Sequence, residues 1–299
     1  MHLSVHDKSV SAVLLADSGS TKTDWCLVVD GSPVFQCQTQ GLNPALQPVA
    51  QVKNVLVDEF LVEYQKYSSQ PFSSLADSVA VRFYGAGCKG NGAVVMREVL
   101  ADSFGVPVER ISVESDLMAA AHALCGANEG IVSILGTGSN SCLYDGEKIV
   151  SNVSPLGYIL GDEGSGAVLG KHFINALFKG RLPESIMWDF VGSTGLDADS
   201  IIRRVYREPM VNRFLASLSP FIYSHIGCAQ IENIVISNFI DFFKNNILHY
   251  RRPDLRVNAL GGVAYYFKPQ LQTAAVECGC QLGEILRSPM PGLVAACKG

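Results

Sequence analysis

The chain has little charge, and no sign of charge predominates. Only 17% of its 299 residues are Asp, Glu, Lys or Arg, and 23 basic residues stand against 28 acidic ones, which gives a net charge of −5. A chain without a basic excess offers no broad cationic surface, so we expect neither a nucleic acid nor a membrane as a partner. Hydrophobic residues make up 48% of the chain, which excludes a disordered protein.

Long hydrophobic runs and a cysteine framework are missing as well. No apolar run approaches the roughly 18–20 residues that span a bilayer, and the polar opening MHLSVHDKSVSA is unlike a secretory signal. The nine cysteines are odd in number and irregularly spaced, and Cys278 and Cys280 lack the further Cys or His partners of a zinc site. These absences favour a cytoplasmic location and no structural metal.

Strand and helix signals follow one another twice along the chain. In each half, three short strands joined by turns precede segments with helical spacing. The predicted strands of these two meanders cover residues 10–17, 25–29, 33–37, 131–135, 140–144 and 148–152. The pattern predicts two related α/β domains with a cleft between them, residues 1–127 and 128–299. The second domain would contain a mainly helical stretch, and we expect the last helix to pack back on the first domain.

Residues 17–24, DSGSTKTD, form the first glycine-rich turn. Glycine and small hydroxyl residues let successive backbone N–H groups point into one concavity that can hold phosphate oxygens. Asp17 ends a buried strand, where its charge is costly unless it meets a cation, and Mg²⁺ usually takes only one or two carboxylates. An ordinary hairpin turn has the same composition, so this segment alone leaves both interpretations open.

A Walker A loop is excluded for the same segment. Lys22 and Thr23 resemble its last two residues, but no glycine stands immediately before Lys22 or five residues before it. A strand is predicted to follow, where a Walker A loop requires a helix.

A second glycine-rich turn repeats the pattern of the first. Gly136, Thr137, Gly138 and Ser139 follow another apolar strand, and Asp145 and Gly146 close the next hairpin as Asp30 and Gly31 do in the first half. The repetition indicates a polyphosphate held by two such turns.

A dinucleotide-binding fingerprint is a rival interpretation. Gly85, Gly87 and Gly90 have the G-x-G-x-x-G spacing after a predicted strand, and Glu114 is an acidic residue about 24 positions further on. That fold places the fingerprint after its first strand, whereas here three antiparallel strands come earlier. We therefore interpret this segment as a turn that lines the cleft.

Asp116 stands just past a short strand, at the start of an Ala-rich helix. A carboxylate at the carboxyl end of a strand is well placed to act as a general base for a hydroxyl group. A helix cap, supplied by Ser115 or Asp116, is an equally good explanation, and the residues alone do not decide between them.

Three further polar loops are candidate ligand contacts. Asp162 and Glu163 either face a sugar or simply favour a helix N-terminus. Asn43 could pair with an amide or a hydroxyl, and Gly261 and Gly262 would let an adenine lie against the backbone, although a plain strand-to-helix turn looks the same.

Taken in order, these segments resemble a known family. ADSGSTKTDW and LGTGS look like its two phosphate motifs, ALGGV its adenosine motif, VESDLMAA its catalytic aspartate segment, and GDEGSG a loop near the sugar. From about Ala12 onward the chain resembles the BadF/BadG/BcrA/BcrD-type ATPases of the sugar kinase/Hsp70/actin superfamily, and more closely their N-acetylglucosamine kinase members.

The resemblance implies two ribonuclease-H-like domains, the actin-like ATPase fold, that close on ATP, Mg²⁺ and a sugar. The enzyme would transfer phosphate from ATP to the 6-hydroxyl of N-acetylglucosamine or a related amino sugar. Asp116 would be the base and Asp17 would organise Mg²⁺ through water. Nucleotide contacts would come from Gly19, Ser20, Thr21, Lys22, Gly136, Thr137, Gly138, Ser139, Gly261 and Gly262, and sugar contacts from Asn43, Asp116, Asp162 and Glu163.

Some features of the resemblance stay open. The short, hydroxyl-poor stretch at residues 87–90 departs from other members of the family. A related class, the ATP-driven activators of dehydratases, holds an iron–sulfur cluster between subunits through cysteines, for which Cys125 and Cys142 are the candidates. A non-catalytic sugar sensor is a third class. A homodimer through the helical part of the second half is expected.

Overall fold

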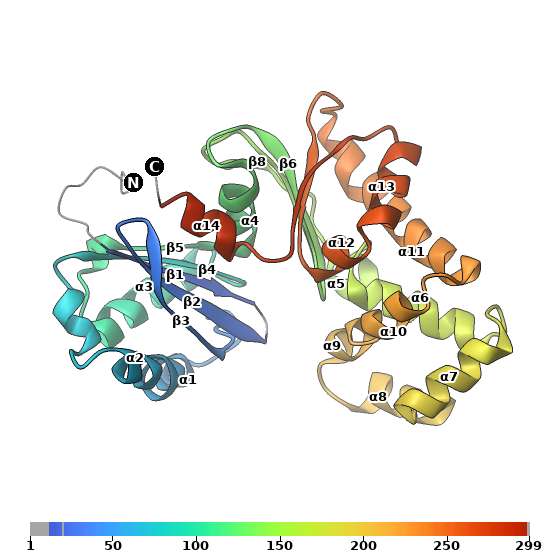
Figure 1. Ribbon diagram of the computed structural model, residues 1–299, viewed down its shortest axis with the longest axis horizontal. Coiled ribbons are helices and arrows are strands. Elements are labelled where there is room, and N and C mark those ends of the chain that lie inside the picture. The colour runs from blue at the N-terminus through green and yellow to red at the C-terminus, as the bar shows by residue number, and fades with distance from the viewer. Residues whose placement is uncertain (1–11, 20, 298–299) are drawn as a thin grey trace. The chain divides into compact units, whose positions relative to one another are not determined.

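The computed structural model describes residues 12–19 and 21–297, and these form two compact units (Figure 1). The first unit runs to Gly126 and takes up the chain again from Pro289, and the second comprises Ala127–Ser288. The predicted N-terminal extension, the first two residues of the first predicted strand and Ser20 lie outside the described residues.

The first unit is built on a mixed five-stranded sheet in the order β3-β2-β1-β4-β5. Its strands are β1 (Ala12–Ser18), β2 (Lys22–Val29), β3 (Ser32–Gln40), β4 (Val79–Gly85) and β5 (Ile111–Ser115). The first three strands are antiparallel neighbours, whereas β1, β4 and β5 are parallel. Asp17 pairs with Tyr84 and Tyr84 with Glu114, so the carboxyl ends of the three parallel strands meet at one edge of the sheet.

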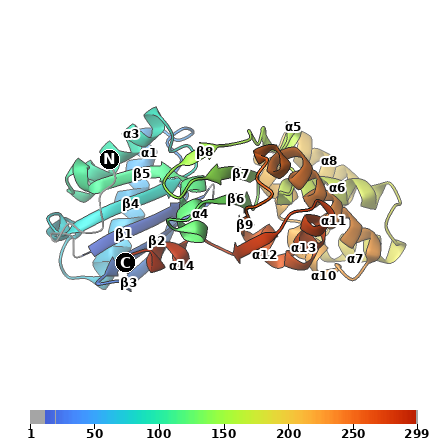
Figure 2. The ribbon, with the colours of Figure 1, turned by 90° about the horizontal axis from the view of Figure 1, so that it is seen from above.

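Both faces of this sheet are buried, which explains the nearly continuous apolar run of β1. Leu14 and Ala16 belong to a core that includes Trp25, whereas Leu15 belongs to a second cluster with Leu293. One face packs against the helical segment α1 (Val49–Asn54), η1 (Val55–Leu61) and α2 (Val62–Tyr67), and against α3 (Asn91–Phe104). The other face is covered by α4 (Asp116–Cys125) and by α14 (Met290–Ala295), which lie side by side (Figure 1, Figure 2).

The second unit repeats the sheet of the first, in the order β10-β9-β6-β7-β8. Its strands are β6 (Gly130–Leu135), β7 (Ser139–Tyr144), β8 (Ile149–Ser151), β9 (Val257–Leu260) and β10 (Leu282–Leu286). Numbered within each unit, both sheets have the strand order 3-2-1-4-5, and in both the first three strands are antiparallel. The predicted α/β class with two related halves is confirmed.

Between β8 and β10 the second unit is mainly helical. Its helices are α5 (Gly157–Leu160), α6 (Gly166–Phe178), α7 (Glu184–Thr194), α8 (Ala198–Arg207), α9 (Val211–Ala216), α10 (Ser219–Ser224), α11 (Ala229–Phe242), α12 (Gly262–Tyr266) and α13 (Lys268–Glu277). The sequence predicts a single helix between β9 and the next strand, whereas the structure has two, α12 and α13. The helix is interrupted at Phe267, and Pro269 enters the first turn of α13.

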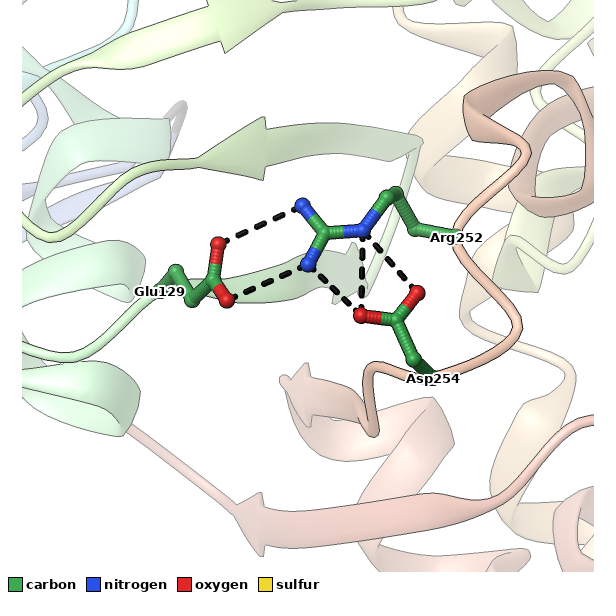
Figure 3. Close-up of polar contacts among 3 residues, drawn as sticks. All are labelled: Glu129, Arg252 and Asp254. Carbon is green, nitrogen blue, oxygen red and sulfur yellow. Dashed lines mark hydrogen bonds and ion pairs between the residues drawn. The ribbon is translucent and has the colours of Figure 1, made fainter.

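An arginine ties the start of the second unit to a distant loop (Figure 3). Arg252, shortly before β9, donates from Nη2 to Glu129 Oε1 at 3.1 Å and to Asp254 Oδ2 at 2.7 Å. Because Glu129 directly precedes β6, this guanidinium fixes the first strand of the sheet beside the loop that leads into the next parallel strand. Among the described residues, no helix is long and apolar enough to cross a membrane.

Candidate active site

Asp116 lies at the carboxyl edge of the first sheet, and its neighbour is the helix cap. Ser115 Oγ accepts a hydrogen bond from Met118 N at 3.3 Å, so Ser115 is the N-cap of α4. Asp116 Oδ1 accepts a hydrogen bond from Leu117 N at 2.9 Å. Burial raises the pKa of Asp116, while the Leu117 N–H and the charge of Lys89 partly oppose this. The cap explanation therefore belongs to Ser115, and Asp116 is left with a second carboxylate oxygen for other chemistry.

Asp17 is the second carboxyl group at this edge. Burial raises the pKa of Asp17 to about 7, and the negative charges of Asp24 and Asp116 add to this effect, while Lys22 lowers it. When burial and nearby negative charges destabilise the ionised form of a carboxyl group, a cation beside it stabilises that form. Mg²⁺ bound largely through water and phosphate oxygens needs only one or two protein carboxylates, so the residues present fit such an ion.

The first glycine-rich turn joins β1 to β2 and is closed by a bond from Gly19 N to Lys22 O at 2.9 Å. A strand follows the turn, which agrees with the exclusion of a Walker A loop. Thr21 is exposed, and the Lys22 ammonium pairs with Asp24 Oδ2 at 2.9 Å. The prediction for Ser20 falls outside the described residues.

Asn43 lies in the loop of residues 41–47, and its hydrogen bonds determine the orientation of its side-chain amide. Its Oδ1 accepts from Ala45 N at 3.0 Å, and its backbone N donates to Gln47 Oε1 at 2.7 Å. Because Ala45 N can only donate, the oxygen must face it, and Nδ2 remains as a donor for a ligand. Gly87, at φ +76°, packs so closely on Asn43 Oδ1 that a side chain would not fit. The G-x-G-x-x-G segment thus lines the loop of Asn43.

The second glycine-rich turn joins β6 to β7 and is hydrogen-bonded to the start of α6. Gly136 N donates to Gly138 O at 3.0 Å, while Gly136 O and Thr137 O accept from Gly166 N and Ala167 N at the start of α6. These contacts occupy the carbonyl groups and give the turn a fixed shape.

Asp162 lies against this second turn. It adopts a left-handed φ of +53°, and a Cβ added at Gly138 would lie 3.1 Å from its Oδ2. Burial raises its pKa to about 6, an effect that the Ser139 N–H opposes and the charge of Glu163 reinforces. The Glu163 carboxylate accepts from Asn245 Nδ2 at 3.1 Å. A ligand bound by Asp162 would therefore lie next to any phosphate held by this turn.

A cavity of about 630 Å³ opens beside the same turn. It is lined by Gly136, Thr137, Ala216, Ser219, Pro220, Tyr223, Gly262, Val263, Tyr266 and Phe267. Gly261, at φ +118°, passes so close to Leu135 O that no side chain is tolerated there. An apolar, aromatic cavity with a few polar groups in its lining suits a nucleoside. The sequence indicated the glycines of this cavity but not Tyr223 or Tyr266.

Comparison with solved structures shows the family to which the chain belongs. A crystal structure from Porphyromonas gingivalis, of a protein with the provisional name N-acetylglucosamine kinase, is 46% identical, with 95% of this chain and 98% of that one covered and a TM-score of 0.89. The chain belongs to the N-acetylglucosamine kinase-like family of BadF/BadG/BcrA/BcrD-type ATPases. The resemblance seen in the sequence is thereby confirmed.

Solved structures of lower sequence identity show a similar fold alone. A protein from Chromobacterium violaceum with the same provisional name is 20% identical, with 97% and 99% coverage and a TM-score of 0.75. A glucokinase of the ROK family from Streptomyces griseus, solved with glucose and AMPPNP, is 15% identical, with 96% and 98% coverage and a TM-score of 0.51. No protein-family model and no curated protein sequence matched the chain.

The structure of this N-acetylglucosamine kinase-like protein gathers the predicted residues into two groups. Asp17, Asp116, Asn43 and the first turn share the carboxyl edge of the first unit, while the second turn, Asp162, Glu163, Gly261 and Gly262 belong to the second. The cysteines considered for an iron–sulfur cluster are poorly exposed, at 8% for Cys125 and 0% for Cys142. Buried thiols of this kind suit packing rather than a cluster shared between subunits.

Proposed function

We propose that this protein is an ATP-dependent kinase that phosphorylates the 6-hydroxyl of N-acetylglucosamine or of a related amino sugar. The observation that carries the proposal is the 46% identity, over 95% of the chain, to the Porphyromonas gingivalis protein that bears this provisional name. The two glycine-rich turns and the carboxyl groups beside the first of them supply the groups that phosphoryl transfer needs.

Asp116 acts as the general base. The sugar hydroxyl oxygen bonds to the γ-phosphorus, the bond from that phosphorus to the β,γ-bridging oxygen breaks, and the hydroxyl proton passes to Asp116 as ADP leaves. The raised pKa of Asp116 supports this role, because a carboxylate that is a stronger base than usual accepts a proton more readily near neutral pH.

The nucleotide contacts come from both turns and from the cavity of the second unit. Gly19, Ser20, Thr21 and Lys22 would hold phosphate oxygens together with residues 136–139, and the cavity beside Gly261 and Gly262 would take the adenosine. Asp17 would hold Mg²⁺ through water, and a bound magnesium ion would neutralise charge on the transferring phosphate.

The sugar contacts are assigned to Asn43, Asp162 and Glu163. The Asn43 amide offers a donor to a sugar oxygen, and the Asp162 carboxylate accepts from a sugar hydroxyl. The raised pKa of Asp162, about 6, supports such a role, because a hydroxyl donor would stabilise its ionised form.

The wider setting follows the same proposal. The two units act as the two domains of the kinase, with a boundary near residue 127, and the protein works in the cytoplasm.

We expect a homodimer through the helical part of the second unit, where Trp188 and Tyr206 are 72% and 78% exposed. Light scattering after gel filtration should give twice the chain mass, and the double variant Trp188→Ser/Tyr206→Ser should give the mass of one chain. A wild-type monomer at micromolar concentration would contradict the dimer.

A coupled assay of ADP release tests the function directly. The panel is N-acetylglucosamine, glucosamine, N-acetylmannosamine and N-acetylmuramic acid, with Asp116→Asn as the inactive control. We expect ADP release that depends on one or more of these sugars, and a product with phosphate on the 6-oxygen by NMR. ADP release that no sugar stimulates would reject the proposal, and sugar binding without ADP release would point to a sensor.

A further inference from the structure

The hydroxyl of Ser18, the last residue of β1, contacts Leu42, in the loop of residues 41–47, and Thr23, in β2 just past the first glycine-rich turn. Its Oγ accepts from Leu42 N at 2.8 Å and donates to Leu42 O at 2.9 Å. The Thr23 hydroxyl, on the far side of the first glycine-rich turn, is 2.7 Å from the same oxygen. Ser18, Thr23 and Leu42 are all fully buried, so no water replaces these bonds.

A second set of contacts fixes the loop that carries Asn43. Gly41 N donates to Thr21 O at 3.1 Å, which attaches this loop directly to the turn. The Gln47 side chain bridges the loop internally, since its Oε1 accepts from Asn43 N at 2.7 Å and its Nε2 donates to Gly41 O at 3.0 Å. The loop of residues 41–47 is therefore bonded to the turn at Thr21 and at Ser18.

We propose that Ser18 is a positioning residue that couples nucleotide binding at the turn to sugar binding at Asn43. The inference rests on the proposed function, which assigns phosphate to the turn and the sugar to Asn43. A buried hydroxyl bonded both to this loop and to the strand that leaves the turn fixes the position of the loop relative to the turn. A ligand that orders one loop lowers the entropy cost of ordering the other, so each ligand strengthens the binding of its partner.

Removal of the Ser18 hydroxyl takes away one of the two attachments between the loop of residues 41–47 and the first glycine-rich turn. In Ser18→Ala, Leu42 N and Leu42 O both lose their buried partner, so the loop of Asn43 is held to the turn only by the bond from Gly41 N to Thr21 O. The turn keeps its own bond from Gly19 N to Lys22 O. The coupling between the ligands should fall more than the affinity for either ligand alone.

The test is calorimetry with N-acetylglucosamine, with and without AMPPNP and Mg²⁺. In the wild-type protein we expect AMPPNP to tighten sugar binding by about 5–150-fold, the usual range of coupling between sites. In Ser18→Ala this ratio should fall to within about twofold of one, and hydrogen exchange at Leu42 N should accelerate. The matched control is Ser133→Ala, because Ser133 is also fully buried in a strand but its hydroxyl has no hydrogen-bond partner among the described residues.

A second variant tests the same loop from its other side. Gln47→Ala removes the internal bridge without touching Ser18 or the turn, and its site is only half-buried, so folding is preserved. It should lower the coupling ratio too. A ratio that stays at the wild-type value in Ser18→Ala and Gln47→Ala overturns the inference. A wild-type protein that binds both ligands without coupling overturns it and leaves the proposed function standing, whereas one that binds neither ligand overturns both.

Discussion

Asp116 shows how neighbouring residues divide two tasks at the scale of single side chains. Ser115 caps α4, so Asp116→Asn should leave the fold intact while turnover falls by about 10²–10⁴-fold through loss of the base. Because burial raises the pKa of Asp116, wild-type activity should also decline at a higher pH on the acid side than an ordinary aspartate would give. The measurement is turnover against pH by ADP release, with the melting temperature as a control for folding. Turnover near the wild-type value in the variant would remove Asp116 from the mechanism.

Asp17 makes a prediction about stability. Its folded pKa of about 7 lies above the unfolded value of 3.8, so its contribution to stability is full below pH 3.8 and is lost as the pH rises to about 7. At pH 8 the ionised group therefore destabilises the ligand-free protein, on the order of 1–4 kcal/mol at about 1.4 kcal/mol per pKa unit. Asp17→Asn should raise the melting temperature at pH 8 more than at pH 4, and should weaken magnesium-dependent nucleotide binding. A lower melting temperature at pH 8 would contradict the assignment.

Both carboxylates could be found in the sequence, because each stands where an apolar strand ends. Ser18 and Gln47 could not. Their roles depend on bonds to Leu42, Gly41 and Asn43, and the sequence predicts no such tertiary contacts between a strand end and a loop more than twenty residues further along the chain.

At the scale of elements, the second glycine-rich turn can be tested through its glycines. A Cβ at Gly136 would meet nothing within 4 Å and would stand beside the nucleoside cavity. Gly136→Ala should therefore keep the melting temperature of the ligand-free protein and weaken AMPPNP binding by about tenfold or more, a loss of about 1.4 kcal/mol. Calorimetry and thermal melts check both parts.

The control for this turn is Gly192→Ala, at another open position, in α7. It should leave nucleotide binding unchanged and stabilise the helix by up to about 1 kcal/mol. AMPPNP binding that is equally strong in Gly136→Ala and the wild type would show that the turn does not hold phosphate.

Strands and turns were the elements that the sequence predicted best, because buried strands bounded by glycine turns leave a clear pattern, as β1 and β6 do. The helical spacing of apolar residues predicts a helix at residues 49–67, and the structure has a helical segment there, but its middle, η1, is a π-helix. An apolar period near 3.6 residues does not distinguish these bonding patterns over two turns. The aromatic wall of the nucleoside cavity was missed because Tyr223 and Tyr266 come from different helices.

At the scale of the whole molecule, the C-terminal helix is a structural part of the first unit. Leu293, on α14, is 2% exposed and packs with Leu15 and Cys26. Leu293→Ala should therefore cost about 2–5 kcal/mol, and hydrogen exchange should accelerate in β1 and β2 but not in β6 and β7. The control Leu248→Ala, at a site that is 47% exposed, should stay within about 0.5 kcal/mol of the wild type. Faster exchange in both sheets alike would contradict a role for α14 confined to the first unit.

The position of α14 also sets the order in which the protein can be completed on the ribosome. The strands of the first unit emerge early, but the helix that covers one face of their sheet is translated only after all of the second unit. Until α14 has emerged, the nascent first unit keeps part of that apolar face open, so this unit is completed only by a segment that follows the second unit in the chain.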